Sequence, residues 1–155
     1  MVKSDCGLCA IAKEADNDKL VYRDEHWIAT NAADVPGWVM LNTLSHIEGP
    51  WSLSPEQAEG LGQLQQKLSA IIRKVTGAEL VYLMSFGETS KHCHLLFMPR
   101  FDDTPEESRG LALLTKAAEL ANPEDALRIT TLLRAEAMGK FVLAGQDARS
   151  FYGRP

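Results

Sequence analysis

The side chains best suited to chemistry in this sequence are thiols and imidazoles in four separated places. They are Cys6, Cys9, His26, His46, His92 and His94. A Cys-x-x-Cys pair places two thiolates within reach of one metal ion, and a tetrahedral zinc site needs two further ligands. His46 and His92 complete a set of soft and borderline ligands that suits zinc. The alternatives for the cysteine pair are two buried thiols without a ligand role, or a redox motif.

Two of the histidines flank one residue in the stretch 91–100, whose apolar character predicts a β-strand. Alternation along a strand puts His92, His94 and Leu96 on one face, with successive side chains roughly 7 Å apart. Three interpretations of the histidine pair are open: two ordinary structural histidines, two ligands of one metal, or one ligand beside one nucleophile or base. Imidazole can attack phosphorus when its far nitrogen keeps a proton that a backbone carbonyl holds. His26 has no partner in its local pattern and is interpreted as a surface histidine.

Composition limits the classes of protein to consider. A chain of 155 residues predicts one domain, or one domain with an extension. The net charge of −5 argues against binding extended nucleic acid, although a single nucleotide needs only a few local donors. No apolar run is long enough for a membrane span, and residues 1–16 do not resemble a signal peptide. We therefore expect a cytoplasmic protein with reduced cysteines.

The elements that must position these residues can be predicted from local patterns. Short strands are expected over 20–23, 26–30 and 38–41, followed by a loop over 43–53 that holds His46. Ser54 and Gln57 form a capping box around Pro55, and apolar residues then recur at helical spacing until Gly77. Strands over 79–86 and 91–98 follow as an antiparallel hairpin. The prediction is an α+β fold, with an antiparallel sheet of about five strands crossed by the long helix.

The character of the sequence changes after Arg100. Helix starts are predicted at Thr104-Pro105 and at Asn122-Pro123, and the short joint between the two apolar patterns predicts a helical hairpin. We expect one domain over 1–100 and a C-terminal helical extension over 101–155.

Five stretches, taken in their order along residues 6–100, resemble the histidine-triad (HIT) family. They are Cys-Gly-Leu-Cys at 6–9, Asp-Val-Pro-Gly-Trp-Val-Met at 34–40, Ser-His-Ile at 45–47, Leu-Ser-Pro-Glu at 53–56, and Gly-Glu-Thr-Ser-Lys-His-Cys-His-Leu-Leu-Phe-Met-Pro-Arg at 87–100. The family motif is His-x-His-x-His followed by apolar residues. The resemblance implies an enzyme that hydrolyses or transfers a nucleoside monophosphate through a nucleotidyl-histidine intermediate.

The resemblance also implies roles for particular residues. His94 would be the nucleophile, and Asn31, Gly87 and Thr89 would contact the nucleotide at ribose and phosphate. Zinc-binding members of the family use the ligands that match Cys6, Cys9, His46 and His92. A small-molecule nucleotide substrate and a homodimer are the partners that the family leads us to expect.

The sequence departs from the family pattern at two positions. Leu96 occupies the third histidine position, and Trp38 stands where many members carry a histidine. The third histidine would donate to the phosphate, and removing such a donor commonly costs ~10²–10³ in rate. The alternative to an active hydrolase or transferase is therefore a weakly active or inactive nucleotide-binding module with a regulatory role.

Overall fold

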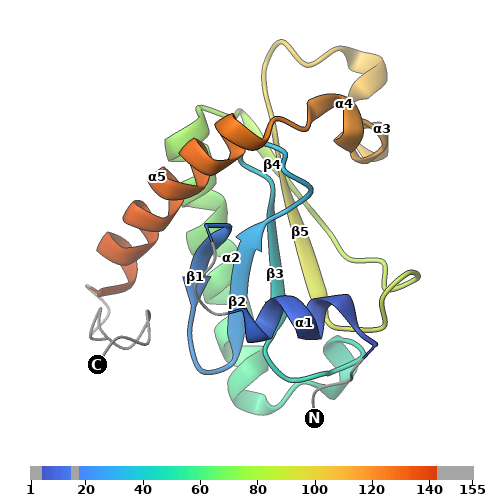
Figure 1. The fold of residues 1–155 in the computed structure, drawn as a ribbon, viewed down its shortest axis with the longest axis vertical. Helices are drawn as coiled ribbons and strands as arrows, with labels where there is room; N and C mark the ends of the chain where they lie inside the picture. Colours follow the sequence, from blue (N-terminus) through green and yellow to red (C-terminus); the bar gives the residue numbers. More distant parts are fainter. Residues whose placement is uncertain (1–4, 15–17, 143–155) are drawn as a thin grey trace.

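The computed structural model describes residues 5–14 and 18–142, and its centre is a five-stranded sheet (Figure 1). The strands are β1 (Leu20–Arg23), β2 (Trp27–Asn31), β3 (Val39–Thr43), β4 (Leu80–Met84) and β5 (His94–Arg100). The helices are α1 (Gly7–Lys13), α2 (Pro55–Thr76), α3 (Leu111–Thr115), α4 (Ala117–Leu120) and α5 (Pro123–Val142), with 3-10 turns η1 (Pro50–Ser52) and η2 (Glu106–Ser108). The strand order is β1-β2-β3-β5-β4, and every neighbouring pair is antiparallel. The predicted α+β class and five-stranded sheet are confirmed.

The long helix α2 begins and ends where the sequence predicts. The Ser54 side chain accepts a hydrogen bond from the Gln57 backbone, and the Gln57 side chain accepts one from the Ser54 backbone. Gly77 ends the helix at φ 73°, a conformation that glycine adopts without a steric penalty. One face of α2 then buries Leu64, Leu68, Ile71 and Ile72.

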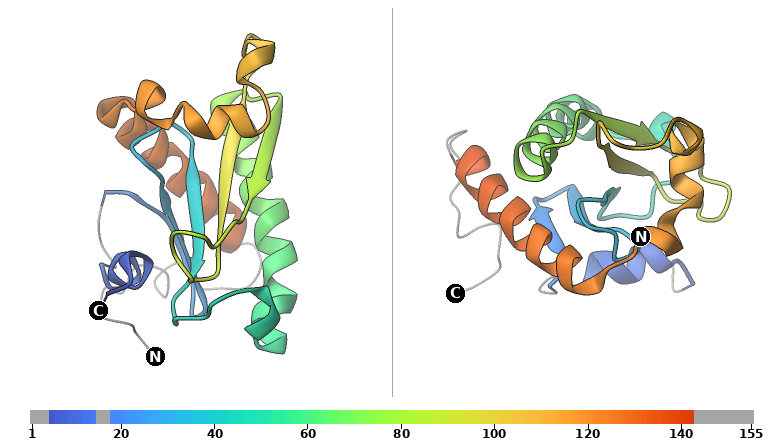
Figure 2. Two further views of the ribbon diagram at one scale, coloured as in Figure 1. Left: turned by 90° about the vertical axis from the view of Figure 1, so that its right-hand side faces the viewer. Right: turned by 90° about the horizontal axis from the view of Figure 1, so that it is seen from above.

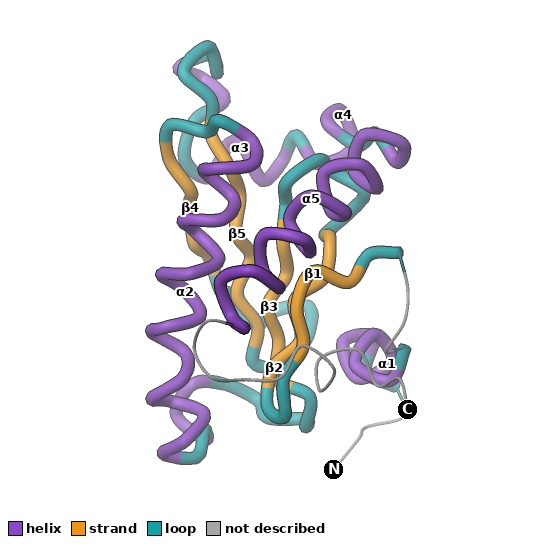
Figure 3. Tube along the Cα trace, turned by 90° about the vertical axis from the view of Figure 1, so that its left-hand side faces the viewer, coloured by secondary structure: helices purple, strands orange, loops and turns teal. Residues whose placement is uncertain are grey.

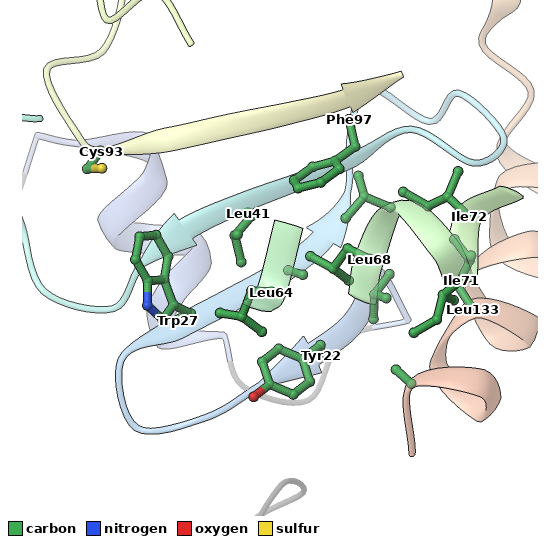
Figure 4. Close-up of a cluster of buried hydrophobic side chains, with 14 residues drawn as sticks. Tyr22, Trp27, Leu41, Leu64, Leu68, Ile71, Ile72, Cys93, Phe97 and Leu133 are labelled. Atoms are coloured by element: carbon green, nitrogen blue, oxygen red, sulfur yellow. The ribbon is translucent and has the colours of Figure 1, made fainter. Parts of the chain in front are cut away.

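The main hydrophobic core lies between the sheet and the pair α2 and α5, which lie side by side in Figure 3. Phe97, Leu41 and Trp27 point from the strands into this layer, where they meet the apolar side of α2 (Figure 4). Leu133 of α5 joins the same cluster. Burying a large apolar side chain contributes about 1.5–3 kcal/mol, so this layer is a main source of the fold's stability.

The opposite face of the sheet is covered by α1 and by the short helices α3 and α4, which Figure 2 shows at separate ends of the strands. Ala12 of α1 packs on Ile28, and Leu113 of α3 packs with Trp38 and Met98. Leu96 of β5 packs on this face, and alternation puts His94 on the same face of the strand. We therefore look for a functional site on this face of the sheet.

The C-terminal region is helical, but its helices do not pack against one another as a simple hairpin. The stretch from Thr104 forms η2, α3 and α4 in place of one helix, because Gly110 and Lys116 leave the helical conformation. Asn122 caps α5 through a hydrogen bond from the Asp125 backbone. α5 then crosses to the far face of the sheet, so the region covers both faces.

The predicted boundary after Arg100 stays a prediction. Helix α5 shares the main core with α2, and Arg134 donates hydrogen bonds to the carbonyls of Leu20 and Asp18. The extension predicted to reach residue 155 lies outside the described residues after 142.

No helix in the described part of the chain is both long enough and apolar enough to cross a lipid bilayer.

Candidate functional site

Four side chains distant in sequence converge at one end of the sheet. The ligand atoms of Cys6, Cys9, His46 and His92 all lie within 4.8 Å of one another. Cys9 Sγ lies 3.3 Å from His46 Nδ1 and 3.5 Å from His92 Nδ1, and Cys6 Sγ lies 3.5 Å from His92 Nδ1. The two imidazole rings meet edge to face at 83°. The structure thus brings together the full ligand set that the sequence predicted.

The ligand chemistry and spacing fit a zinc ion. Zn–S bonds of about 2.3 Å and Zn–N bonds of about 2.0 Å at tetrahedral angles place sulfur and nitrogen about 3.5 Å apart. The observed sulfur–nitrogen separations of 3.3–3.5 Å match that value. Cys9 and His92 are each only 1% exposed, so water does not compete freely for these ligand atoms.

Cys6 lies at the start of α1, where the helix backbone favours a thiolate. Burial raises the pKa of the Cys6 thiol, but hydrogen bonds from the Cys9 backbone and side chain, from Ser90 and from the Leu8 backbone outweigh it, so the pKa is lowered. The Ser90 hydroxyl lies 3.9 Å from Cys6 Sγ. A lowered thiol pKa favours the charged form that metals bind.

His92 is held in the tautomer that a metal ligand needs. Its Nε2–H donates to the Thr43 carbonyl at 2.8 Å, and the Thr43 hydroxyl lies 3.1 Å from the same nitrogen. Burial lowers the pKa of His92 against the opposing effect of the Thr43 carbonyl, so the ring is neutral with its lone pair on Nδ1. Such outer contacts orient a ligating imidazole.

Strand β5 begins at His94, so the prediction that His92 is part of the strand is wrong. The chain bends at His92 but stays next to β3, since the Thr43 backbone N–H donates to the Cys93 carbonyl at 3.2 Å. Cys93 N–H in turn donates to the Ile47 carbonyl, which ties the loop carrying His46 to this segment. His92 is not part of the hydrogen-bonded ladder of the sheet. Its ring instead contacts Thr43, Cys6 and Cys9.

His94 is half-buried, and its Nδ1 lies 2.6 Å from the His92 carbonyl oxygen. A carbonyl oxygen only accepts, so this bond keeps the proton on Nδ1 and leaves the lone pair on Nε2. This is the arrangement that a nucleophilic imidazole requires. The Asn42 side chain lies opposite His94 in the β3–β5 register, fully buried.

Leu96 follows His94 on the same face of β5 and lies between two methionines. Met40 of β3 is its partner on one side and Met84 of β4 on the other. Trp38 belongs to the same cluster. The two departures from the family motif are therefore in one apolar patch.

Two cavities lie beside these residues and share Leu8 and Ile11 of α1. One, of about 470 Å³, is lined mostly by apolar residues, together with Asn31 and Thr30 at the end of β2 and the charged residues Glu14 and Lys19. The other, of about 530 Å³, lies at the cysteine–histidine cluster and is lined by polar residues from the turn before β5. The walls of the first are Leu8, Ile11, Glu14, Lys19, Thr30, Asn31, Ala32, Ala33, Trp38, Met40, Leu96, Leu114 and Ala117.

The residues predicted to contact a nucleotide divide between these cavities. Asn31 is 8% exposed; its side-chain amide donates to the carbonyls of Val35 and Trp38, and its Oδ1 finds no partner among the described residues. Thr89 lines the second cavity. Gly87 adopts φ 72° in the turn and lines neither cavity. Their contact with a nucleotide stays a prediction.

Sequence reasoning missed the residues that support the histidines. Thr43 anchors His92, and Asn42 donates from its amide to the same Thr43 carbonyl at 3.0 Å. The sequence carried a signal for them, since two polar residues continue the apolar run 38–41. Leu114 and Ala117 were also missed, because no local pattern shows that α3 and α4 fold back over the first cavity.

Comparison with known proteins places this fold among solved structures. Neither the models of protein families nor the curated proteins give a match. A hypothetical histidine triad nucleotide-binding protein from Sulfolobus tokodaii has a TM-score of 0.67 at 17% identity, with 86% of this chain and 93% of that chain covered. A zinc-bound histidine triad family protein from Mycobacterium smegmatis has a TM-score of 0.66 at 19% identity, with 90% and 97% covered.

A diadenosine triphosphate hydrolase from Plasmodium falciparum, solved with cyclomarin A, has a TM-score of 0.62 at 15% identity, with 81% of this chain and 80% of that chain covered. Identities in this range establish architecture and leave activity open. The sheet order, the long helix and these likenesses agree with the motifs read from the sequence: the chain has the fold of the histidine-triad proteins.

Proposed function

We propose that this chain is an enzyme of the histidine-triad type that hydrolyses or transfers a nucleoside monophosphate from a nucleotide conjugate. The observation that carries this proposal is the 2.6 Å hydrogen bond from His94 Nδ1 to the His92 carbonyl. It fixes the tautomer whose Nε2 can attack phosphorus. The test of this proposal is to compare the rates of AMP release by wild type and by His94→Ala. The substrates are adenosine phosphoramidate and dinucleoside polyphosphates.

The proposed reaction has two displacement steps at the α-phosphorus. His94 Nε2 gives its lone pair to phosphorus, and the bond from phosphorus to the leaving group breaks. The proton on Nδ1 stays on the ring, and the His92 carbonyl stabilises the positive charge that the ring then carries. Water or another hydroxyl acceptor attacks the same phosphorus and loses its proton to solvent. The N–P bond breaks, and its electron pair returns to Nε2 of His94.

The two cavities supply places for the two parts of the substrate. The cavity over Trp38 and Met40 suits a nucleoside. Asn31 lines it, and its buried Oδ1, which has no partner among the described residues, is the acceptor that a ribose hydroxyl would use if the side chain turned toward the cavity. The polar cavity beside Thr89 suits the group beyond the α-phosphate. His94 itself lines neither cavity, but in the sequence it stands between Lys91, which lines the second cavity, and Leu96, which lines the first.

We also propose that Cys6, Cys9, His46 and His92 hold zinc. Zinc, when bound, joins α1 to the segment that carries the His92 carbonyl and so stabilises the fold at the site. Two features of the chain would favour zinc binding: the four side chains already lie together, and the contact with Thr43 fixes the His92 tautomer.

A second candidate function is a nucleotide-binding module with little catalysis. The observation that favours it is Leu96, which has a methionine on each side and offers no hydrogen bond where the family has a histidine. This module would bind AMP in the apolar cavity, and its AMP release would not depend on His94.

Substituting Ala117, which lines the apolar cavity, is expected to block nucleotide binding. A phenyl ring at Ala117→Phe would project into the space proposed for the nucleoside, and we expect the affinity for AMP to fall by about tenfold or more. Isothermal titration measures it. Ala118→Phe on the same helix is the matched control, since Ala118 is exposed and lines neither cavity. Equal losses in the two variants would contradict this placement of the nucleoside.

We propose that two copies of the chain pair through the edge of the sheet at β4. This strand is an edge strand, and Leu80, Leu83 and Phe86 are 45%, 40% and 59% exposed. Exposed apolar edges are sites of pairing between chains.

Sedimentation can test the dimer. Leu83→Glu is expected to convert a wild-type dimer to a monomer, because it places a charge in an apolar contact. Leu132→Glu on α5, where the leucine is 46% exposed, is expected to leave the dimer intact. A wild-type monomer at micromolar concentration, or equal effects of the two charges, would contradict the proposed interface.

A further inference from the structure

The surroundings of Leu96 determine what kind of leaving group His94 can displace. Leu96 is 8% exposed and lies between Met40 and Met84 across the two neighbouring strands. None of these three side chains can donate a proton. Leu96, the next residue after His94 on the same face of β5, is therefore apolar and has an apolar neighbour on each adjacent strand.

Other side chains in this patch do not replace the missing donor. Trp38 offers an indole N–H, which donates a hydrogen bond but does not give up its proton. Tyr82 is the one described residue of the cluster with a hydroxyl, and it lies opposite Met98, one strand repeat beyond Leu96. The Tyr82 hydroxyl forms a hydrogen bond with the Arg100 side chain and lies close to its positive charge. No described acid in the patch is thus placed to protonate a departing atom beside His94.

Leaving groups differ in how much they need such a proton. Breaking a P–O or P–N bond puts an electron pair on the departing atom, and an amine or a basic alkoxide leaves only if it is protonated. A general acid contributes about 10²–10⁴ to such a step. A phosphate or polyphosphate oxygen is stable as an anion and needs no acid.

The cavity at the cysteine–histidine cluster offers a cation and hydroxyl donors to an anionic group, and the Asp5 carboxylate also lines it. Its lining includes the Lys91 ammonium and the hydroxyls of Thr89 and Ser90, which all precede His94 in the same turn. A cation and two hydroxyl donors can stabilise charge on a departing phosphate without donating a proton to it.

We infer that this site acts on nucleotides whose leaving group departs as an unprotonated anion, namely a phosphate or polyphosphate, and discriminates against amine leaving groups. This inference rests on the proposed function, since it takes His94 to be the nucleophile. In the step, Nε2 bonds to the α-phosphorus as the P–O bond breaks. The electron pair stays on the departing phosphate oxygen, and no proton moves.

A series of aryl esters of AMP tests this inference, because only the acidity of the departing phenol changes along the series. For wild type, log kcat/KM is expected to fall steeply as the pKa of the phenol rises, and adenosine phosphoramidate is expected to be the poorest substrate. A flat dependence, or equal rates for phosphoramidate and dinitrophenyl ester, would overturn the inference. If His94→Ala releases AMP as fast as wild type from even the dinitrophenyl ester, the proposed function fails instead.

Replacing Leu96 provides a second measurement. Leu96→His is expected to raise kcat/KM for the phenyl ester about 10²-fold, as a restored general acid would, and to change the dinitrophenyl ester little. Leu96→Met keeps the apolar volume and is expected to keep the wild-type slope. A Leu96→His variant that binds AMP like wild type but keeps the steep slope would contradict the role given to this position.

The lysine can be tested in the same way. Lys91→Ala is expected to lower kcat/KM for a diadenosine polyphosphate about tenfold more than for the dinitrophenyl ester, since a charged hydrogen bond to the leaving phosphate is lost. Lys13→Ala removes an exposed cation that lines neither cavity and is expected to change neither rate. Equal losses on both substrates for Lys91→Ala would contradict an anionic leaving group in that cavity.

Discussion

His94→Ala is expected to lower the rate of AMP release by about 10³-fold or more, because the variant lacks the nitrogen that attacks phosphorus. The structure gives the physical basis: the His92 carbonyl holds the Nδ1 proton, so the lone pair is on Nε2. The measurement is kcat/KM with a dinucleoside polyphosphate, followed by chromatographic detection of AMP. The affinity for AMP should change far less, since binding uses the apolar cavity.

His26→Ala is the matched control for this substitution. His26 lies outside the cysteine–histidine cluster, and its ring contacts Glu25 at 3.6 Å. We expect this variant to retain wild-type activity and zinc. An unchanged rate of AMP release in His94→Ala would leave the nucleotide-binding module as the better account of the protein.

Cys9→Ser is expected to abolish stoichiometric zinc binding and to lower the melting temperature by roughly 10 °C, since loss of a structural metal costs several kcal/mol. Cys9 is buried, and its Sγ lies within 3.5 Å of Nδ1 of both His46 and His92, so its removal takes away the thiol that contacts both rings. Metal analysis of purified protein and thermal unfolding measure the two effects. A chelator should lower the melting temperature of wild type and leave that of the variant unchanged.

Cys93→Ala is the control for Cys9→Ser, because it removes a buried thiol that is not a proposed zinc ligand. Cys93 is nearly as deeply buried as His92 but belongs to the hydrophobic core on the other face, and burial raises the pKa of its thiol. This variant is expected to keep one zinc per chain, with only the loss of stability that a small cavity causes. Wild-type protein without zinc, or a Cys9→Ser variant that keeps it, would contradict the metal site.

The fold and the cysteine–histidine cluster could be predicted from the sequence because their signals are local or belong to a motif. The capping box at Ser54 and the glycine at 77 determine the ends of α2, and helical spacing between them identifies its buried face. The ligand set follows from residue chemistry and the order of the motifs. Its geometry depends on the fold, which brings α1, the loop of His46 and the approach to β5 together.

Other features depend on tertiary contacts that local patterns do not encode. Alternation predicts that His92 is a strand residue, because a local pattern cannot show that its ring contacts Thr43 and two cysteines. The apolar residues after Thr104 fit helical spacing, but spacing does not show that the chain breaks at Gly110 and Lys116. Nor does it reveal that α5 packs against α2 while Leu114 and Ala117 line the cavity on the opposite face.

The measurement that tests the nucleotidyl-histidine intermediate most directly is intact-protein mass spectrometry of a reaction quenched at neutral or alkaline pH, where the N–P bond survives. We expect one adenylyl group per chain early in the reaction with an adenosine substrate, located by peptide mapping to the segment that contains His94. The adduct should be absent from His94→Ala and present in His26→Ala. Release of AMP by wild type without any adduct, at a rate that His94→Ala matches, would contradict the account.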